Sequence, residues 1–578
     1  MADHNARLEA IFQQMADVTE ITGGNRFKVI AFQKVARVLG ELAEDVASIA
    51  PDKLATIPGV GKGTAERIRE FLDTGQIAEH QAMLKEIPPG LPALLDIPGL
   101  GPKTVALLWT KAGITSMADL RAKLAGDALA ELPGFGKKKL ENLRKNIAFA
   151  EEAGKRTRLG EALPQAAYLV HKLRQVPGVT QCDYAGSLRR GKETIGDIDV
   201  LVACESKHNA AVSAAFVKLA DATDVLGQGE TKTSVRTKGG LQIDLRIVEP
   251  DHYGAALLYF TGSKEHNVRL RGRALDMGYT LNEYALADKD DKTKVVASKT
   301  EQDIYKKLKL AWIAPELRED RGEIDRAADG TLPDLITLDD IKSELHAHTN
   351  ASDGTWTIRD LALAAADRGF HTVAVTDHSK SQFQAHGLDA KRLEQHIEAI
   401  RAVAAELTGK ITILAGSEVD ILADGSLDYP DSLLAELDIV VASPHAALSQ
   451  DGAAATKRLL RAIDNRYVTI LGHPTGRLIG RREGLSPDMG QVVKAAAKRG
   501  IAMEINANHW RLDLRDTHAR LALDAGCRLA INTDAHGPAD LDQLRYGILT
   551  ARRAGATAAD VVNCHTAAAL AKWLASTR

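Results

Sequence analysis

The chain of 578 residues has few cysteines, no long apolar run and no excess of basic residues. Its four cysteines, Cys182, Cys204, Cys527 and Cys564, lie far apart. This spacing argues against a disulfide framework and a cysteine zinc site, and suits a reducing compartment. No apolar stretch approaches the roughly 18 residues of a membrane span, and the N-terminus lacks the apolar centre of a signal peptide. We therefore expect a cytoplasmic protein that does not associate with a membrane.

The length and the charge limit the remaining possibilities. A chain of 578 residues is too long for one hydrophobic core, so several domains are expected. The net charge of −3 gives no general attraction for nucleic acid, so such binding must depend on local basic clusters.

One short pattern occurs three times in the first 150 residues: IPGVG at 57–61, IPGLG at 97–101 and LPGFG at 132–136. Such a turn before a helix leaves backbone N–H groups free to bind a phosphate oxygen, and glycine permits close approach. The pattern is that of the helix-hairpin-helix, a clamp for the DNA backbone. Ordinary glycine capping between helices is the alternative, which three copies make less attractive. The glycines concerned are Gly59, Gly61, Gly99, Gly101, Gly134 and Gly136.

Carboxylates gather in the next region. Asp197 and Asp199 are two positions apart on a predicted strand and so share one face, and Asp244 lies on another predicted strand. Three neighbouring carboxylates favour bound Mg²⁺ or Mn²⁺, which can activate a hydroxyl and stabilise leaving pyrophosphate. The preceding Gly186-Ser187 turn and Arg190 offer donors to a triphosphate. Without these additions, a solvated strand edge would explain the two aspartates equally well.

The sequence after residue 335 changes to regular alternation of apolar strands and Ala-rich helices. Seven strand-like runs favour a closed parallel barrel. Metal-binding residue types stand where the strands end, and in a barrel these ends converge. About three ions of Mn²⁺, Zn²⁺ or Fe²⁺ suit so many mixed ligands, and such a cluster can hydrolyse a phosphodiester. The nine candidates are His346, His348, Asp353, His378, Glu418, His445, His473, Asp534 and His536.

Region 1–317 resembles the family X DNA polymerases. The motif GSLRRGKETIGDID, the later Asp244, and the segment YFTGS at 259–263 carry the resemblance. It implies that Asp197, Asp199 and Asp244 hold two catalytic metals. It also implies a set of nucleotide-binding residues, with Tyr259 and Phe260 against the sugar: Gly186, Ser187, Arg190, Gly196, Tyr259, Phe260, Gly262, Asn267 and Arg271. Core packing is the alternative for the two aromatic residues.

The chain departs from this family at two positions. Arg67 stands where the family has the lysine that forms a Schiff base with an abasic sugar, and arginine stays protonated. Lyase activity is therefore not expected, although Lys28 and Lys34 match positions that bind a 5′-phosphate. Gln242 replaces an arginine that the vertebrate relatives carry near the primer terminus.

Region 336–578 resembles the PHP (polymerase and histidinol phosphatase) domain that accompanies bacterial family X polymerases. The motifs HAHTNASDG, TDHS, GSEVD, SPHAA, GHP and NTDAHG carry the resemblance. Every ligand position of the complete pattern is filled. This implies an active 3′–5′ exonuclease or 3′-end-processing phosphodiesterase, with AP endonuclease activity as a further option. A PHP domain retained only for structure is the alternative.

The predicted architecture is multidomain, α+β and α/β. Helix-hairpin-helix domains precede a nucleotidyltransferase palm with a mixed sheet, and a distorted (β/α)7 PHP barrel ends the chain. The expected ranges are a lyase-like helical domain at 1–82, a helix-hairpin-helix domain at 83–155, the palm at 156–255, a nascent-base-pair domain at 256–317, a linker at 318–335 and the PHP domain at 336–578.

The predicted function is gap-filling DNA synthesis in repair, coupled to 3′-end processing. The expected partners are gapped or primer-template DNA and dNTPs, with a monomeric chain. Three rivals remain open: a nuclease whose polymerase half only binds DNA, a small-molecule phosphatase joined to a DNA-binding module, and a DNA-tethering scaffold.

Overall fold

The computed structural model describes most of the chain. The described residues are 4–40, 46–51, 53–57, 60–97, 100–124, 129–130, 132–133, 135–136, 140, 143–144, 147 and 156–578. The chain divides into two compact units, one formed by 1–154 with 480–482, the other by 155–479 with 483–578.

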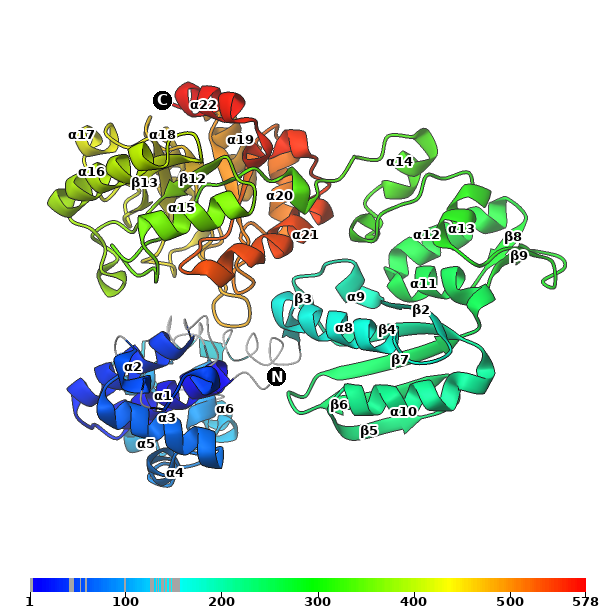
Figure 1. Cartoon of the computed structure of the whole chain (residues 1–578), viewed down its shortest axis with the longest axis horizontal. Coiled ribbons are helices and arrows are strands. Elements are labelled where there is room, and N and C mark those ends of the chain that lie inside the picture. Colours follow the sequence, from blue (N-terminus) through cyan, green and yellow to red (C-terminus); the bar gives the residue numbers. More distant parts are fainter. Residues whose placement is uncertain are drawn as a thin grey trace. The chain divides into compact units, whose positions relative to one another are not determined.

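The first unit is helical, as the Pro-Gly punctuation predicts (Figure 1). Leu8, Phe12 and Met15 recur at helical spacing in its first helix and are fully buried in one apolar core. The elements are α1 (His4–Ile21), α2 (Arg26–Gly40), η1 (Val46–Ser48), η2 (Leu54–Thr56), α3 (Lys62–Thr74), α4 (Ala78–Leu84), η3 (Pro92–Asp96), α5 (Pro102–Ala112) and α6 (Met117–Leu124).

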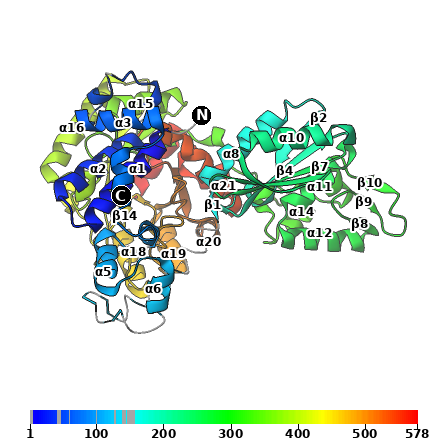
Figure 2. The same cartoon turned by 90° about the horizontal axis from the view of Figure 1, so that it is seen from below.

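A mixed five-stranded sheet in the order β2-β4-β7-β6-β5 follows. The strands are β2 (Val179–Tyr184), β4 (Asp197–Cys204), β5 (Ala222–Gln228), β6 (Lys232–Thr237) and β7 (Gln242–Val248). Only β4 and β7 run parallel; the other neighbours are antiparallel. Helices α8 (Leu159–Leu173) and α10 (Asn209–Leu219) cover one face and α11 (Tyr253–Thr261) the other (Figure 2). The predicted mixed palm sheet is confirmed.

A small helical region with a three-stranded sheet comes next. It contains α12 (Lys264–Asp276), β8 (Tyr279–Leu281), β9 (Leu286–Asp288), β10 (Val295–Ala297), α13 (Glu301–Lys307) and α14 (Glu323–Asp329). Helix α14 lies within the range that we expected to be a linker, 318–335. Its Ile324 and Ala327 belong to the same core as Leu270 of α12, because their apolar side chains face that helix layer. Part of that range is therefore folded against the preceding domain.

The C-terminal region forms a seven-stranded parallel sheet whose strands follow one another in chain order. The strands are β11 (Ser343–Glu344), β12 (Thr372–Val375), β13 (Thr412–Asp420), β14 (Ile439–Ser443), β15 (Ile470–Leu471), β16 (Ala502–Asn506) and β17 (Arg528–Asn532). A parallel bridge between Ala347 and Ala535 joins the segments that follow the first and last strands. The predicted seven-stranded barrel is confirmed.

Helices surround these strands (Figure 1). They are α15 (Ile358–Asp367), α16 (Ala390–Glu406), α17 (Asp431–Leu434), α18 (Gly452–Asp464), α19 (Met489–Arg499), α20 (Asp516–Asp524), α21 (Leu544–Ala554) and α22 (Ala567–Ser576). Alternate strand residues pack inward with Trp573 of α22, whose Nε1 donates to the carbonyl of Gly500 just before β16. The side chains of α22 therefore close the end where the strands begin and leave the other end for polar groups. In the described part of the chain, no helix is long and apolar enough to span a membrane.

Candidate active and metal-binding sites

Three aspartates meet on the parallel pair β4 and β7. Asp199 lies in register with Asp244, and Asp197 with Gln242. Ile198 and Val200 alternate with the aspartates and pack into the core below α8 and α10. The carboxylates therefore project from the other face, as their two-residue spacing predicts.

The charges of this group are poorly balanced within the protein. Burial, followed by repulsion from Asp197 and Asp244, raises the pKa of Asp199 to about 7. Burial and repulsion from Asp244 also raise the pKa of Asp197. Burial acts in the same direction on Asp244, but hydrogen bonds from Gln242 and Lys232 outweigh it and lower its pKa. A divalent cation with a preference for oxygen ligands would relieve this repulsion.

The Gly186-Ser187 turn lies directly against these carboxylates. The N–H of Ala185 donates to the carbonyl of Asp199 over 2.8 Å, and Ser187 lies in the short helix α9 (Gly186–Arg189). Gly186 has a φ of +62°, and a Cβ there would collide with Oδ2 of Asp199, so only glycine fits. Gly196 immediately precedes β4.

Arg190, predicted to bind the triphosphate, already has partners. Its Nε lies 3.0 Å from Oε1 of Glu319, and its Nη1 donates to the carbonyl of Thr261 over 2.5 Å. Thr261 precedes Gly262, whose φ of +68° and ψ of −154° suit glycine alone. The predicted triphosphate turn is thus joined to the start of the next domain.

Four of the predicted nucleotide-binding residues lie on α11 and α12. The rings of Tyr259 and Phe260 meet edge to face, 5.2 Å apart, and the guanidinium of Arg246 lies 5.0 Å from the ring centre of Phe260. Tyr259 is 39% exposed, which does not fit the alternative of plain core packing. Asn267 donates to the carbonyl of Tyr259, and Arg271 is exposed one turn further along α12.

Two arginines from the C-terminal region contact the predicted triphosphate turn. Arg553 of α21 donates through Nη1 to the carbonyl of Arg190 over 2.7 Å and to Glu319 over 2.9 Å. Arg477 forms a two-pronged ion pair with Glu193, at 3.0 and 2.6 Å. Sequence reasoning missed both arginines, since nothing local in the sequence relates residues so far apart.

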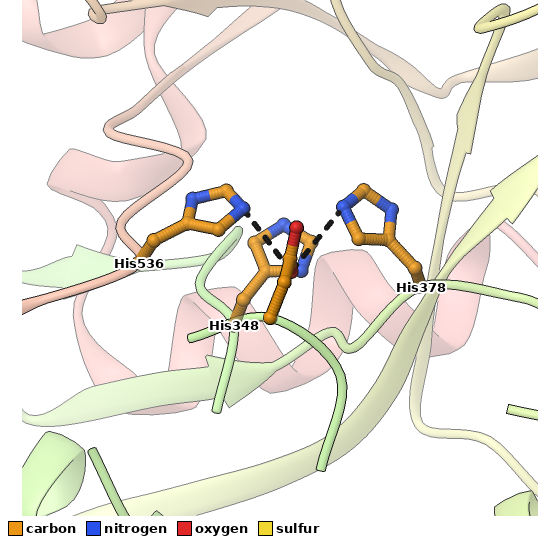
Figure 3. A group of neighbouring side chains, drawn as sticks. His348, His378 and His536 are labelled. Carbon is orange, nitrogen blue, oxygen red and sulfur yellow. Dashed lines mark ion pairs between the residues drawn. The ribbon is translucent and has the colours of Figure 1, made fainter. Parts of the chain in front are cut away.

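The nine metal-ligand candidates of the C-terminal region come from the ends of six of its seven strands. His346 and His348 follow β11, His378 follows β12, Glu418 lies in β13, His445 follows β14, His473 follows β15, and Asp534 and His536 follow β17, while Asp353 lies in the loop after β11. Figure 3 shows the imidazoles of His348, His378 and His536 converging. Strand topology therefore brings together residues that are far apart in the sequence.

Eight of the nine candidates form three overlapping groups whose ligand atoms lie within 4.8 Å of one another. The groups are His348, Asp353, His378 and His536; His346, His348, Glu418 and Asp534; and His378, Glu418 and His445. His473 belongs to none of the three groups, but its Nε2 lies 2.8 Å from Oε1 of Glu418. Glu418 is thus the common neighbour at the centre.

Several buried polar atoms of this cluster are suited to bind cations. Nδ1 of His348 and Nε2 of His346 have no hydrogen-bond partner among the described residues, and Nε2 of His348, 2.9 Å from Oδ1 of Asp534, makes no well-aligned hydrogen bond with it. Buried polar atoms ordinarily have partners. Burial, followed by His378 and His536, lowers the pKa of His348 to about 4, so its ring stays in the neutral form that binds metal.

Backbone strain marks two of these positions. His473 and Asp534 have φ values of +21° and +55°, which side-chain-bearing residues rarely adopt. Such strain persists where surrounding structure imposes it, and it is common at functional sites.

A second layer of acidic residues orients the histidines, and sequence reasoning missed it. Glu504 of β16 accepts from Nδ1 of His346 over 2.8 Å, and Asp420 lies 3.1 Å from Nδ1 of His445. Carboxylates in this position fix the ring and leave the other nitrogen for a metal. A signal was present: Glu504 interrupts the apolar run GIAMEIN, and Asp420 shares a strand face with Glu418.

The last glycines of the first two Pro-Gly repeats have the same backbone geometry. Gly61 and Gly101 cap α3 and α5 with φ −82° at both and ψ of 171° and 169°. Any residue tolerates these angles, and among described atoms a Cβ on Gly61, Gly101 or Gly136 would meet nothing within 4 Å. The described part of the fold therefore does not require glycine at these positions. Gly59, Gly99 and Gly134 lie outside the described residues.

The helical unit also contains Lys28 and Lys34, which match positions that bind a 5′-phosphate, and Arg67, which stands at the position of the lyase lysine. Lys28 and Arg67 both pair with Glu79, at 2.8 and 2.6 Å, whereas Lys34 is exposed on α2. Arg67 also donates to the carbonyl of Gly63. The residue at the lyase position thus takes part in a local ion-pair network.

Comparison with known proteins covers nearly the whole chain. Family models match for a helix-hairpin-helix domain at 3–77, a SAM-like helix-hairpin-helix tandem at 91–147, the DNA polymerase beta palm at 160–236, the DNA polymerase beta thumb at 256–319 and a PHP domain at 344–508.

Three relatives are similar to different shares of the chain. The chain is 36% identical over 565 residues to the DNA polymerase/3′-5′ exonuclease PolX of Bacillus subtilis, covering 97% of this chain and 98% of that protein. It is 27% identical to rat DNA polymerase lambda over 51% of this chain and 53% of the other. A protein of Thermoanaerobacter sp. (strain X514) described as a "probable phosphatase" is 30% identical over 38% of this chain and 89% of its own length.

Proposed function

Because this chain belongs to the family X DNA polymerases that carry a PHP domain, we propose that it fills short gaps in DNA and processes 3′ ends in a second centre. The observation that carries the proposal is the presence of two complete and chemically different ligand sets in one chain. The polymerase set is three aspartates on adjacent strands, and the PHP set is a buried cluster of histidines and carboxylates.

In the polymerase centre, Asp197, Asp199 and Asp244 would hold two divalent cations, Mg²⁺ or Mn²⁺. Such cations would supply activation of the primer hydroxyl and charge stabilisation of leaving pyrophosphate. Ser187 and the N–H groups of the Gly186 turn bind the incoming dNTP triphosphate. Arg190 joins them when its contact with Glu319 is exchanged for a phosphate. Tyr259 and Phe260 lie against the sugar, with Asn267 and Arg271 toward the nascent base pair.

In the PHP centre, the nine predicted ligands would hold about three cations of Mn²⁺, Zn²⁺ or Fe²⁺. Such cations would supply a hydroxide nucleophile and neutralise the scissile phosphodiester. Glu504 and Asp420 keep His346 and His445 oriented. The proposed reaction is 3′–5′ exonucleolytic or 3′-end-cleaning hydrolysis, with cleavage at abasic sites as a related activity.

The helical unit supplies affinity for DNA without sequence preference. Its glycine-capped turns present N–H groups to phosphates of gapped or primer-template duplex, and Lys28 and Lys34 approach a 5′-phosphate. We propose that the chain acts as a monomer, with the domain boundaries predicted above except that α14, within the expected linker, belongs to the preceding domain.

A gapped duplex with Mg²⁺ or Mn²⁺ tests both centres together. We expect Asp244→Ala to abolish primer extension and leave 3′ degradation intact, and His346→Ala to do the reverse. Asp251→Ala is the matched control for the first variant, since Asp251 is exposed and pairs with the exposed Lys299. Loss of both activities in one variant would contradict two separate centres.

The rival functions predict different results in the same assay. A nuclease with an inactive polymerase half gives no extension, and the register of Asp199 with Asp244 argues against it. A small-molecule phosphatase cleaves histidinol phosphate much faster than a recessed 3′ end. A scaffold that only tethers DNA shows neither activity with any divalent metal.

A further inference from the structure

The loop after β12 starts beside His378, a predicted metal ligand, and its far end returns to the backbone of the same residue. The N–H of Ser379 donates to the carbonyl of Glu418 over 3.0 Å, and the N–H of Leu388 returns to the carbonyl of His378 over 2.8 Å. The tip of the loop is the short helix η8 (Phe383–Ala385). Whatever the tip presents is therefore held close to the PHP centre.

The conformation of this loop is fixed by backbone and polar contacts. Gln382 donates to Asp420 over 3.1 Å, and Arg392 donates to the carbonyls of His386, Gly387 and Ala351. The last contact ties the loop to the segment that carries Asp353. At Gly387, a Cβ would collide with the carbonyl of Ser379. None of these contacts involves the ring of Phe383, so that ring is not needed to hold the loop.

Phe383 is nevertheless a large apolar side chain that is 88% exposed, more than any other large apolar residue described. It lines a hollow of about 540 Å³ together with Asn350, Ser352 and His386. Ser352 also donates through Oγ to Oδ1 of the predicted ligand Asp353 over 3.3 Å. The exposed ring and the hollow thus lie next to the PHP centre.

The surroundings of the ring decide what could cover it. Its exposed sequence neighbours Lys380, Gln384 and His386 are polar, and the hollow beside it is lined largely by polar residues, which favours a partner with both a flat apolar face and polar groups. A single exposed aromatic ring beside polar groups is the arrangement on which bases of single-stranded nucleic acid stack. Stacking tolerates every sequence because each base has a flat π face, which suits an enzyme that degrades DNA of any sequence.

We propose that Phe383 is a stacking platform for an unpaired base of single-stranded DNA at the PHP centre. The hollow beside it receives the terminal nucleoside while the adjacent phosphodiester reaches the ligand cluster. The inference rests on the proposed exonuclease function and adds its substrate form, a frayed or single-stranded 3′ end. A paired terminus would have to open before its base could reach the ring.

The test compares Phe383→Ala, Phe383→Trp and the control Leu338→Ala, which removes another exposed apolar side chain of the same domain. The substrates are two single-stranded oligonucleotides, one with bases throughout and one whose last two residues lack bases. For the first, we expect KM to rise about fivefold to a hundredfold in Phe383→Ala, the range for loss of one stacked base. The second should be degraded equally by all variants.

A second readout does not depend on hydrolysis. An oligonucleotide with 2-aminopurine at its 3′ end and phosphorothioate linkages should lose fluorescence on binding to the wild-type chain. We expect less quenching in Phe383→Ala, recovery in Phe383→Trp, and unchanged primer extension in all three variants.

Two results would overturn the proposal: equal KM and quenching in Phe383→Ala and wild type, or an equal loss on both oligonucleotides. If the wild-type chain degrades neither oligonucleotide, the exonuclease function fails instead, and the quenching measurement still decides whether Phe383 stacks on a base.

Discussion

The two candidate centres differ in how the charge of their carboxylates is balanced. The polymerase centre collects carboxylates alone on two adjacent strands, and Asp199 responds with a pKa raised to about 7 by burial and by its neighbours. The PHP centre mixes histidines with carboxylates. There, burial opposes ionisation of Glu418, but the surrounding histidines outweigh it and hold its pKa well below the ordinary value.

This difference teaches how each site depends on its metals. A site of carboxylates alone is self-repelling and accepts cations as exchangeable partners, in keeping with Mg²⁺ that arrives with a nucleotide. A buried site with imidazole ligands and an oriented second layer suits tightly held transition metals. We therefore expect metals to reside in the PHP centre and to exchange in the polymerase centre. Five predictions test how the two halves of the molecule differ.

The largest effect is expected at the PHP centre from His348→Ala. His348 belongs to two of the three ligand groups, so its loss should lower 3′–5′ degradation by about a thousandfold or more. Primer extension should change little. Metal content after gel filtration should fall in the same variant but not in the control His371→Ala, whose ring contacts Thr372 and a backbone carbonyl outside the cluster. An unchanged metal content would contradict the assignment.

The polymerase half contains a buried carboxylate that is bonded to two arginines. Glu301 is 3% exposed and bonds to Arg189, Arg318 and the indole of Trp312. Glu301→Gln leaves two arginines short of a partner and should cost about 3–5 kcal/mol. Hydrogen exchange in the 256–330 region should rise sharply. The exposed pair of Asp325 with Arg269 supplies the control Asp325→Asn, for which less than about 1 kcal/mol is expected.

The contribution of Glu301 to the stability of the fold should depend on pH. Burial opposes ionisation of Glu301, but Arg318 and Arg189 outweigh it, and its pKa lies well below the ordinary value of 4.5. A lowered folded pKa means that the stabilisation is present above about pH 4.5 and is lost progressively as the pH falls below it. Hydrogen exchange between pH 5 and pH 3, corrected for intrinsic rates, should show this loss in the wild type and not in Glu301→Gln.

A smaller effect is expected from the second layer of the PHP centre. Glu504→Gln keeps the shape but weakens the contact to Nδ1 of His346, so metal affinity or exonuclease rate should fall about 10- to 100-fold. Titration with Mn²⁺ followed by activity measures it, with exposed Glu406→Gln as control. Equal metal dependence in both variants would show that Glu504 is not needed to orient the ligand.

The smallest effect concerns the independence of the two centres. Arg553 supports the carbonyl of Arg190 and the position of Glu319, so Arg553→Ala should raise the KM for dNTP several-fold, about the value of one or two hydrogen bonds. Exonuclease activity should be unchanged, as in the exposed control Arg461→Ala. An equal loss of both activities would indicate damage to the fold rather than positioning.

Local pattern was enough for much of this molecule. The two-residue spacing of Asp197 and Asp199 gave their common face because side chains alternate along any strand. The Pro-Gly repeats predicted turns between short helices, and the alternation of apolar runs predicted a seven-stranded barrel with ligand types at the strand ends. The resemblance to known families supplied the chemistry for each half.

Tertiary structure decided what depends on residues that meet only after folding. The pairing of Arg190 with Glu319, the contact of Arg553 with the same turn and the folding of α14 over part of the expected linker each join segments distant in sequence. The exposure of Phe383 likewise depends on a loop whose two ends are held by backbone hydrogen bonds. No local sequence pattern distinguishes an exposed aromatic side chain from a buried one. The sequence by itself therefore determined which ligands the two centres possess, because ligand chemistry resides in residue types. Only the folded chain decided how those ligands are supported, charged and approached, because burial and long-range contact set these properties.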